Sequence, residues 1–308
     1  MPKHPSVIAH RGASAYLPEH TLVAKALAHG LGADYIEQDV VATRDGVLIV
    51  LHDIYLDLVT DVAERYPERR RDDGHFYVID FVLDELRELG IMERRREDED
   101  RAQFPGRFPR ESMRFPIATL EEELTLIQGL NKSTGRVAGI YPEIKDPAWH
   151  LAHGIDLSHM LLTTLESFGY TTADDDAFVQ SFDAAELRRV REGLGSKLQL
   201  TQLLGGRDDT SSEALARFAE YANGLGLPYQ QLIDAPSGPT TQLRVSALRK
   251  AIEDAGLAVH PYTLRADSLP PFEPDFVELL SFLFDDAKVE GLFCDHPDLA
   301  VKVRDGSP

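Results

Sequence analysis

The chain has 308 residues, 43% of them hydrophobic and 27% charged, an ordinary globular composition with room for one large α/β barrel or two smaller domains. Its formal net charge of −20 argues against a nucleic-acid partner, because phosphate backbones are bound by clustered lysine and arginine. The single cysteine, Cys294, excludes an internal disulfide. No apolar run is long enough to span a bilayer, so we expect no stable membrane insertion.

Residues 1–6 are too few and too polar to form a signal peptide. We therefore expect a cytoplasmic protein, or a periplasmic or secreted one if this sequence is a mature form.

From residue 6 onward, strand-like apolar runs alternate with amphipathic helical segments. The expected strands are Val7–His10, Asp34–Val41, Val47–His52, Ala138–Ile144, Ala177–Phe182, Lys197–Leu203, Gly256–Thr263 and Gly291–Asp295. The expected helices are Glu19–Leu31, Leu120–Leu130, Leu157–Phe168, Ala184–Glu192, Ser212–Ala222, Leu243–Ala255 and Pro274–Asp286. About eight such units predict a parallel sheet closed into a (β/α)8 TIM barrel, with residues 1–308 as a single catalytic domain. The short run Gln231–Ile233 is an extra strand candidate without an assigned place.

Residues 54–116 interrupt this alternation and are rich in charge. They follow a strand that ends in His52 and Asp53, so we expect an insertion over the C-terminal face of the barrel. Two readings are open, a solvated excursion and a cap that shapes the site. We favour the cap, because the apolar residues of Phe76–Ile79 and Phe81–Leu89 need a surface to cover.

Charged side chains stand at the ends of the first four expected strands. These residues are His10 and Arg11, Glu37 and Asp39, His52 and Asp53, and Glu143 and Lys145. Because side chains alternate along a strand, Glu37 and Asp39 face the same side, as do Glu143 and Lys145. Carboxylates buried together repel one another, and a divalent cation relieves that repulsion. Oxygen ligands suit Ca²⁺ or Mg²⁺, although ion pairs with Arg11 or Lys145 would explain the same acids.

Two histidines, His10 and His52, flank this cluster and suit general acid–base catalysis near neutral pH. If they bound the metal instead, zinc or another transition metal would be favoured. Arg11 and Lys145 then serve as phosphate contacts. At later strand ends Phe182, His260 and Tyr262 are candidates for the wall of the pocket, and packing explains each of them equally well.

The sequence resembles the glycerophosphodiester phosphodiesterases, and more closely those of the bacterial periplasmic type. The matching stretches span nearly the whole chain: Ile8-Ala-His-Arg-Gly-Ala-Ser, Leu17-Pro-Glu-His-Thr, Gly32-Ala-Asp-Tyr-Ile-Glu-Gln-Asp, Val50-Leu-His-Asp, Ile140-Tyr-Pro-Glu-Ile-Lys, Val259-His-Pro-Tyr-Thr and Gly291-Leu-Phe-Cys-Asp. Two positions depart from the usual pattern. His20 stands where many members have asparagine, a trait of the closer subgroup, and Cys294-Asp-His-Pro replaces Thr-Asp-Phe-Pro.

The resemblance implies a TIM barrel with a cap-like insertion that hydrolyses glycerophosphodiesters, such as glycerophosphocholine and glycerophosphoethanolamine, to sn-glycerol 3-phosphate and an alcohol. It implies His10 and His52 as the acid–base pair and Arg11 and Lys145 as phosphate contacts. It implies one divalent cation on Glu37, Asp39 and Glu143, with Ca²⁺ favoured and Mg²⁺ as the alternative. Water and the glycerol 2-hydroxyl are both open as the nucleophile.

Other functions stay open at this point. One is a related phosphodiester-cleaving barrel, phospholipase D-like or forming a cyclic phosphate. A metal-dependent lyase would need the carboxylates but not both histidines. A non-catalytic binding protein would be expected to have lost some of the seven polar residues. The expected partners are small-molecule glycerophosphodiesters, and a homodimer is one open oligomeric state.

Overall fold

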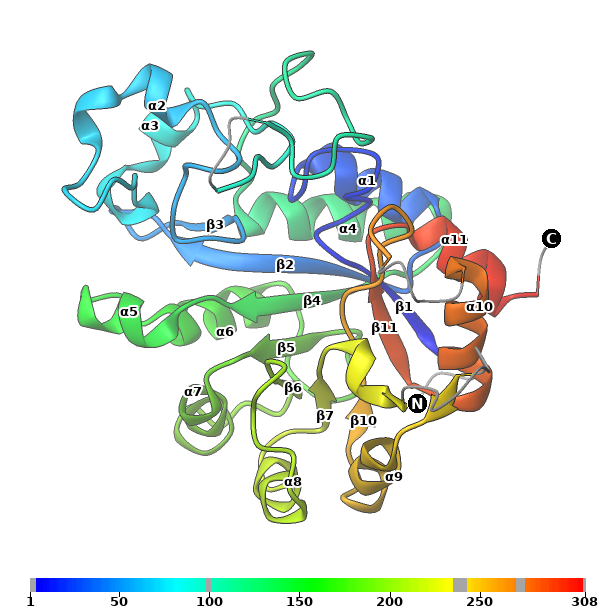
Figure 1. The fold of residues 1–308 in the computed structure, drawn as a ribbon. Coiled ribbons are helices and arrows are strands. Elements are labelled where there is room, and N and C mark those ends of the chain that lie inside the picture. The colour runs from blue at the N-terminus through cyan, green and yellow to red at the C-terminus, as the bar shows by residue number, and fades with distance from the viewer. Residues whose placement is uncertain (1–3, 98–100, 235–242, 270–274, 307–308) are drawn as a thin grey trace.

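The computed structural model describes residues 4–97, 101–234, 243–269 and 275–306. Eight parallel strands form a barrel with helices outside it, which confirms the predicted fold (Figure 1). Around the barrel they are β1 Ser6–Ala9, β2 Tyr35–Ala42, β4 Gly139–Ile144, β5 Phe178–Ser181, β6 Gln199–Leu203, β7 Gly224–Gly226, β10 Ala258–Val259 and β11 Gly291–Cys294. Backbone hydrogen bonds close the ring beyond the short β10: Phe293 N donates to Pro261 O, and Leu264 N donates to Phe293 O, both at 2.9 Å.

The third strand differs from its prediction. It forms β3 Leu48–Val50, which pairs antiparallel with β2 and is not one of the eight barrel strands. The strand that completes the barrel is β7, and its sequence Gly-Leu-Gly carries none of the β-branched or alternating signal by which strands are recognised. A Cβ atom at Gly226 would lie 2.5 Å from Leu203 Cδ2, so a larger residue there would require the Leu203 side chain to move.

The extra strand candidate Gln231–Ile233 is partly confirmed. Ile233–Asp234 forms β8, which pairs antiparallel with β9 Arg244–Val245 in a separate two-stranded sheet. Gln231 belongs instead to a 3₁₀ turn, Tyr229–Leu232.

The helices that cover the barrel are α1 Leu22–Gly30, α4 Leu120–Thr134, α5 Pro147–Ala152, α6 Leu157–Ser167, α7 Ala184–Arg188, α8 Ser212–Ala219, α9 Ala247–Asp254, α10 Phe276–Ser281 and α11 Pro297–Arg304. Of these, α7 and α10 continue as π-helical turns over Arg189–Gly193 and Phe282–Asp286. The start of α4 is fixed by a capping box, in which Thr119 Oγ1 accepts from Glu122 N at 3.2 Å and the Glu122 carboxylate accepts from Thr119 N at 2.9 Å.

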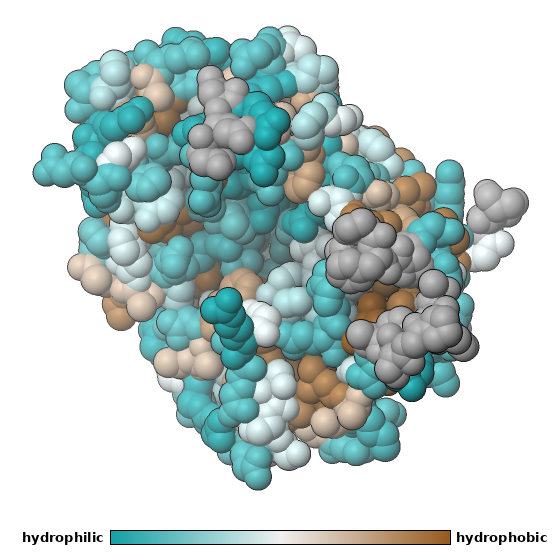
Figure 2. Space-filling model, in the orientation of Figure 1, coloured by the Kyte–Doolittle hydropathy of each residue, from teal (hydrophilic) through white to brown (hydrophobic). Residues whose placement is uncertain are grey.

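Alternation along the strands sorts side chains into two layers. Ile8, Tyr141 and Phe293 are buried together inside the barrel. The intervening residues, such as Ile36 and Val40 of β2, pack outward with the helices in a larger aliphatic cluster. Hydrophilic residues dominate the surface drawn in Figure 2, in keeping with the charged composition.

The segment 54–116 shares an apolar cluster with the barrel edge, in which its Phe76, Phe81 and Leu86 pack with Val41 of β2 and Ile49 of β3. It holds two one-turn helices, α2 Val62–Arg65 and α3 Leu83–Leu86, and 3₁₀ turns at Pro67–Arg69 and Val78–Asp80. In Figure 1 it rises beside β2 and β3. Tyr77 of this segment stacks on Trp149 of α5, with ring centroids 5.5 Å apart.

Candidate active site

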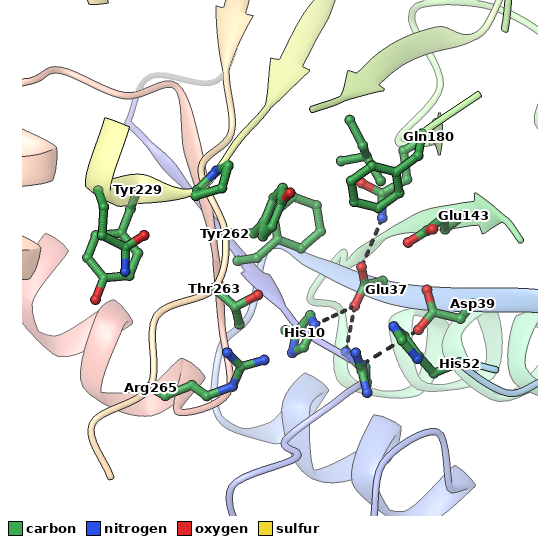
Figure 3. Close-up of a pocket in the computed structure, with 16 residues that line it drawn as sticks. His10, Glu37, Asp39, His52, Glu143, Gln180, Tyr229, Tyr262, Thr263 and Arg265 are labelled. Atoms are coloured by element: carbon green, nitrogen blue, oxygen red, sulfur yellow. Dashed lines mark hydrogen bonds and ion pairs between the residues drawn. The ribbon is translucent and has the colours of Figure 1, made fainter. Parts of the chain in front are cut away.

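A cavity of about 340 Å³ opens at the carboxyl ends of the barrel strands. Its polar wall is formed by His10, Arg11, Glu37, Asp39, His52, Glu143 and Gln180. Its less polar wall includes Phe182, Leu203, Tyr229, Tyr262 and Phe293. Figure 3 shows the carboxylates and both imidazoles turned toward one another in this cavity.

Three carboxylates converge because of the register between β2 and β4. Asp39 stands opposite Glu143 in this parallel pair, and Glu37 points to the same side two residues earlier. One oxygen from each of the three residues lies within 4.8 Å of the others. All three side chains are buried.

The charges of this cluster are not balanced by the protein alone. Burial and the charges of Asp39 and Glu143 raise the pKa of Glu37 well above its ordinary value. Burial and the charge of Asp39 raise the pKa of Glu143 to about 7, although the charge of Lys145 acts in the opposite direction. Burial also acts against the ionised form of Asp39, but Lys145 and His20 outweigh it and hold its pKa well below the usual range.

The buried Oδ1 of Asp39 has no hydrogen-bond partner among the described residues. This unpartnered oxygen of Asp39, the raised pKa values of Glu37 and Glu143, and a donor set made only of oxygen atoms together fit a hard divalent cation.

His10 reaches the cavity through a tight turn after β1. Arg11 and Gly12 have φ angles of 59° and 92°, and a Cβ atom on Gly12 would lie 2.9 Å from the backbone carbon of Ala24. His10 Nδ1 lies 2.6 Å from Asp295 Oδ1. Burial lowers the pKa of His10 to about 4, so its neutral ring donates Nδ1–H to the carboxylate and leaves Nε2 as a base, 3.9 Å from Glu37 Oε2.

His52 reaches the same cavity by a different route. Because β2 extends past the mouth and β3 runs back along it, Leu51 N donates to Asp39 O at 2.9 Å and His52 follows beside Asp39. His52 Nδ1 lies 2.6 Å from Asp53 Oδ1. Burial, with Arg11 and Lys145, lowers the pKa of His52 to about 4, and its ring carries the same tautomer as that of His10.

The two predicted phosphate contacts are held by carboxylates. Arg11 donates its backbone N–H to Glu37 Oε2 at 2.8 Å, and its Nη1 lies 3.0 Å from both oxygens of Glu19. Its buried Nε has no hydrogen-bond partner among the described residues and lies 3.7 Å from Asp39 Oδ2. Lys145 Nζ donates to Glu143 Oε1 at 2.7 Å, beside the cavity but not among its described lining residues.

Of the three residues expected on the pocket wall, two line it. The rings of Phe182 and Tyr262 lie 6.1 Å apart there. His260 does not face this cavity: it is buried inside the barrel, where its Nδ1 lies 2.8 Å from the Tyr141 hydroxyl, and it lines a separate cavity at the opposite end. Because side chains alternate along a barrel strand, the side chain of His260 points into the barrel interior, toward the amino ends of the strands.

Sequence reasoning gave no role to Asp295 or Gln180. Asp295 binds His10, and Gln180 Nε2 donates to Glu37 Oε1 at 2.9 Å. Asp295 directly follows the last barrel strand, so the strand-end rule that singled out the first four pairs applies equally to it. Gln180 lies inside an apolar strand sequence and stands opposite Glu143 only in the folded sheet.

A buried chain of polar groups stands behind Asp39. His20 Nε2 lies 2.7 Å from Asp39 Oδ2, Lys25 Nζ lies 3.2 Å from His20 Nδ1, and Lys25 Nζ lies 3.0 Å from Glu123 Oε2. Burial and Lys25 lower the pKa of His20 to about 3, so its ring is neutral. Since an ammonium can only donate, Nδ1 accepts from Lys25 and Nε2–H donates to Asp39.

Residues 10–299 match the sequence profile of the Glycerophosphoryl diester phosphodiesterase family. The chain is 39% identical to a glycerophosphodiester phosphodiesterase of Haemophilus influenzae, over 97% of this chain and 90% of that protein. It is 36% identical to one of Treponema pallidum, over 96% of this chain and 90% of that protein.

Two solved structures share the fold. A phosphodiesterase of Oleispira antarctica, in complex with the product sn-glycerol-3-phosphate, aligns with a TM-score of 0.68 at 20% identity, over 98% of this chain and 97% of that chain. A glycerophosphodiester phosphodiesterase of Thermotoga maritima aligns with a TM-score of 0.63 at 20% identity, over 99% of this chain and 100% of that chain. None of the helices described in this chain is long and apolar enough to cross a membrane.

Proposed function

The chain belongs to the glycerophosphoryl diester phosphodiesterase family, and we propose that it hydrolyses glycerophosphodiesters to sn-glycerol 3-phosphate and an alcohol in the cavity described above. The observation that carries this proposal is the convergence of two His–Asp pairs on one cluster of three carboxylates. The names of the two curated relatives and the product bound to the Oleispira enzyme support the substrate class.

Glu37, Asp39 and Glu143 would hold one divalent cation, which when bound neutralises charge on the phosphate. The proposed ion is Ca²⁺, with Mg²⁺ as the alternative, because Ca²⁺ is the usual ion of the bacterial periplasmic-type subgroup. We assign the chain to that subgroup because it shares the trait His20. Arg11 is the proposed guanidinium contact to a phosphate oxygen, and its unpartnered Nε–H supports that role. Lys145 adds a second positive charge beside Glu143.

The two histidines divide the proton transfers between them. One imidazole takes the proton of the attacking oxygen, which belongs to water or to the glycerol 2-hydroxyl, as a new P–O bond forms. The other imidazole gives a proton to the departing oxygen as the old P–O bond breaks and the alcohol leaves. Attack by the 2-hydroxyl gives a cyclic phosphate that water then opens, so both routes use the same groups.

The segment 54–116 is the proposed cap of this cavity. Its Arg94 and Arg107 reach carboxylates at the barrel mouth, which supports that placement. Homodimer formation remains a prediction, which size-exclusion chromatography with light scattering tests. The location also remains a prediction: cytoplasmic, or periplasmic or secreted if this sequence is a mature form.

The direct test is release of sn-glycerol 3-phosphate from glycerophosphocholine and glycerophosphoethanolamine. We expect the purified chain to release it, chelator to abolish the release, and added Ca²⁺ to restore it better than Mg²⁺. Release of choline and a lysophosphatidate when lysophosphatidylcholine replaces these substrates, or accumulation of a stable cyclic phosphate, would favour the related phosphodiesterase chemistries. Absence of any chelator-sensitive product would contradict the proposal.

The acid–base roles are tested with His10→Ala and His52→Ala. Each should lower kcat by roughly 10²–10⁴-fold, because a positioned proton carrier is lost. Ca²⁺ affinity, measured by calorimetry, should stay as in the wild type, since the carboxylates are untouched. The exposed His159 provides the control, and His159→Ala should leave kcat unchanged. Near-normal turnover of His10→Ala would show that the scheme is wrong.

A further inference from the structure

We infer that Arg94 and Arg107, both supplied by the segment 54–116, are positioning residues for the two histidines. The segment then does more than cover the cavity: it fixes the direction in which each imidazole points. This inference rests on the proposed function, because it concerns the same acid–base pair.

The contacts behind the two histidines follow one pattern. Asp53 binds His52 through Oδ1 at 2.6 Å and accepts from Arg94 Nη1 through Oδ2 at 2.8 Å. Asp295 binds His10 through Oδ1 at 2.6 Å and accepts from Arg107 Nη2 through Oδ2 at 2.6 Å. In both cases one carboxylate oxygen faces the imidazole and the other faces an arginine of the same segment.

Both arginines are themselves fixed in place. The side chains of Arg94 and Arg107 are 9% and 4% exposed. Arg94 also donates to both oxygens of Glu19, at 2.9 and 2.7 Å. Arg107 donates to both oxygens of Asp267, at 2.8 and 3.0 Å, and its guanidinium carbon lies 3.8 Å from the centre of the Phe104 ring.

A guanidinium is suited to this arrangement, because its planar fork offers five donors in fixed directions. Each arginine uses part of the fork to anchor itself to one carboxylate and the remainder to hold the carboxylate behind a histidine. A lysine ammonium is a point charge on a flexible stem and cannot fix two carboxylate planes in the same way.

The carboxylate plane in turn sets the imidazole plane. An Asp that loses the partner of its Oδ2 can rotate about its Cβ–Cγ bond, and the short bond from Nδ1–H then no longer fixes the ring. Outer partners of this kind are worth roughly 10–100-fold in activity where they orient a reacting group. The loss should fall on kcat, because the arginines act on the histidines rather than on bound substrate.

The two arginines should not be equally important. Asp295 Oδ2 has a second cation, Arg265, whose Nε donates to it at 2.9 Å. Arg94 is the one arginine that the structure describes on Asp53. Removing Arg94 should therefore cost more than removing Arg107.

The experiment compares Arg94→Gln and Arg107→Gln with the wild type in the 308-residue chain supplied with Ca²⁺. We expect kcat for glycerophosphocholine to fall roughly 10–100-fold, more for Arg94→Gln, with KM near the wild-type value. The same variants are then assayed on a glycerophosphodiester of a nitrophenol. A nitrophenolate leaves without a proton, so the variant that misaligns the general acid should recover most of its rate, and the other should not.

A purely structural role would lower kcat equally on both substrates, so a difference in the loss of kcat between them supports a positioning role. The matched control is Arg71→Gln in the same segment, where Arg71 donates to both oxygens of Asp80 at 2.8 and 2.7 Å. It should leave kcat unchanged on both substrates. If a glutamine variant fails to fold, the corresponding Arg→Lys variant replaces it, and its kcat should also fall.

Near-wild-type kcat in both folded arginine variants would overturn the inference while leaving the proposed function standing. An equal loss in Arg71→Gln, or equal losses of both arginine variants on both substrates, would also overturn it. If the wild type itself releases no sn-glycerol 3-phosphate, the proposed function fails instead, and the two failures are distinguished by this one measurement.

Discussion

The two ends of the barrel both contain cavities, and the larger one is not the candidate active site. The cavity at the amino ends of the strands, lined in part by Tyr35, Phe178 and His260, measures about 960 Å³, against about 340 Å³ at the carboxyl ends. Asp174, Asp175, Asp176 and Glu290 also border it. Volume and acidity alone would therefore favour the wrong end.

The difference lies in how the acids are satisfied. Asp175 accepts from the backbone N–H groups of Thr171 and Thr172, both at 2.7 Å, in an exposed turn. Glu290 accepts from Val259 N at 2.8 Å and pairs with Arg249 at 3.0 Å. At the carboxyl ends, by contrast, Asp39 keeps a buried oxygen without a partner among the described residues. This unpartnered oxygen lies beside Glu37, whose pKa burial and the neighbouring carboxylates raise well above its ordinary value, and the two together mark the end where a ligand belongs.

The largest expected effect comes from neutralising one acid at each end. Glu37→Gln should lower activity by at least ~100-fold, because a ligand of the proposed cation is lost. Asp174→Asn, an exposed acid beside the other cavity, should leave activity unchanged. Release of sn-glycerol 3-phosphate measures both. Equal losses in the two variants would contradict the contrast between the two ends.

The next effect concerns the buried chain behind Asp39. Lys25→Met alone would leave Glu123 buried and unpaired, at a cost of about 3–5 kcal/mol in stability. The double variant Lys25→Met/Glu123→Gln removes both charges and should fold. We expect its Ca²⁺ affinity to weaken by roughly 10–100-fold, because the tautomer and orientation of His20 toward Asp39 are no longer fixed.

Calorimetric titration with Ca²⁺ measures this directly, and thermal unfolding without metal confirms that the double variant is folded. An unchanged Ca²⁺ affinity would show that the buried polar groups behind Asp39 serve stability alone.

A smaller effect is expected at the apolar wall of the carboxyl-end cavity. Phe182 is 49% exposed and lines this wall. Phe182→Ala should raise KM by roughly three- to tenfold, a loss of about 1 kcal/mol in binding free energy, with kcat retained. Comparing glycerophosphocholine with glycerophosphoethanolamine would show whether the ring contacts the alcohol. A fall in kcat with unchanged KM would show that the Phe182 ring does not contribute to substrate binding.

The smallest effect on turnover is expected at the amino ends, where His260 should influence stability instead. Burial lowers the pKa of His260 from 6.5 to about 4. Between these pH values the unfolded chain binds a proton that the folded chain does not. The stabilisation is thus complete above pH 6.5 and is lost as pH falls toward 4, by about 3 kcal/mol at most.

His260→Gln should therefore flatten the decline of the free energy of unfolding between pH 7 and pH 4.5, measured by urea denaturation. Its kcat and KM at pH 7.5 should match those of the wild type. A pH dependence identical to that of the wild type would show that His260 does not contribute, and a loss of turnover would give the amino ends a part in catalysis.

Much of this protein follows from the sequence by itself. The alternation of apolar runs and amphipathic helices predicted the barrel, because each local period depends only on neighbouring residues. The same reasoning brought Glu37, Asp39 and Glu143 to one side of adjacent strands, where the structure places them within 4.8 Å. Strand-end polarity is a local signal: it placed His10, Glu37 and Glu143 correctly at the mouth, but it failed for His260, which follows β10 and faces the barrel interior.

Only the tertiary structure decided what depends on distant pairing. The antiparallel return of β3 brings His52 to the mouth, and the strand Gly224–Gly226 exists because its neighbours pair with it. Arg107 meets Asp295 across 188 residues, and Arg94 meets Asp53 across 41. No local period encodes such contacts, since they form only after the barrel has closed and the segment 54–116 has packed on its edge.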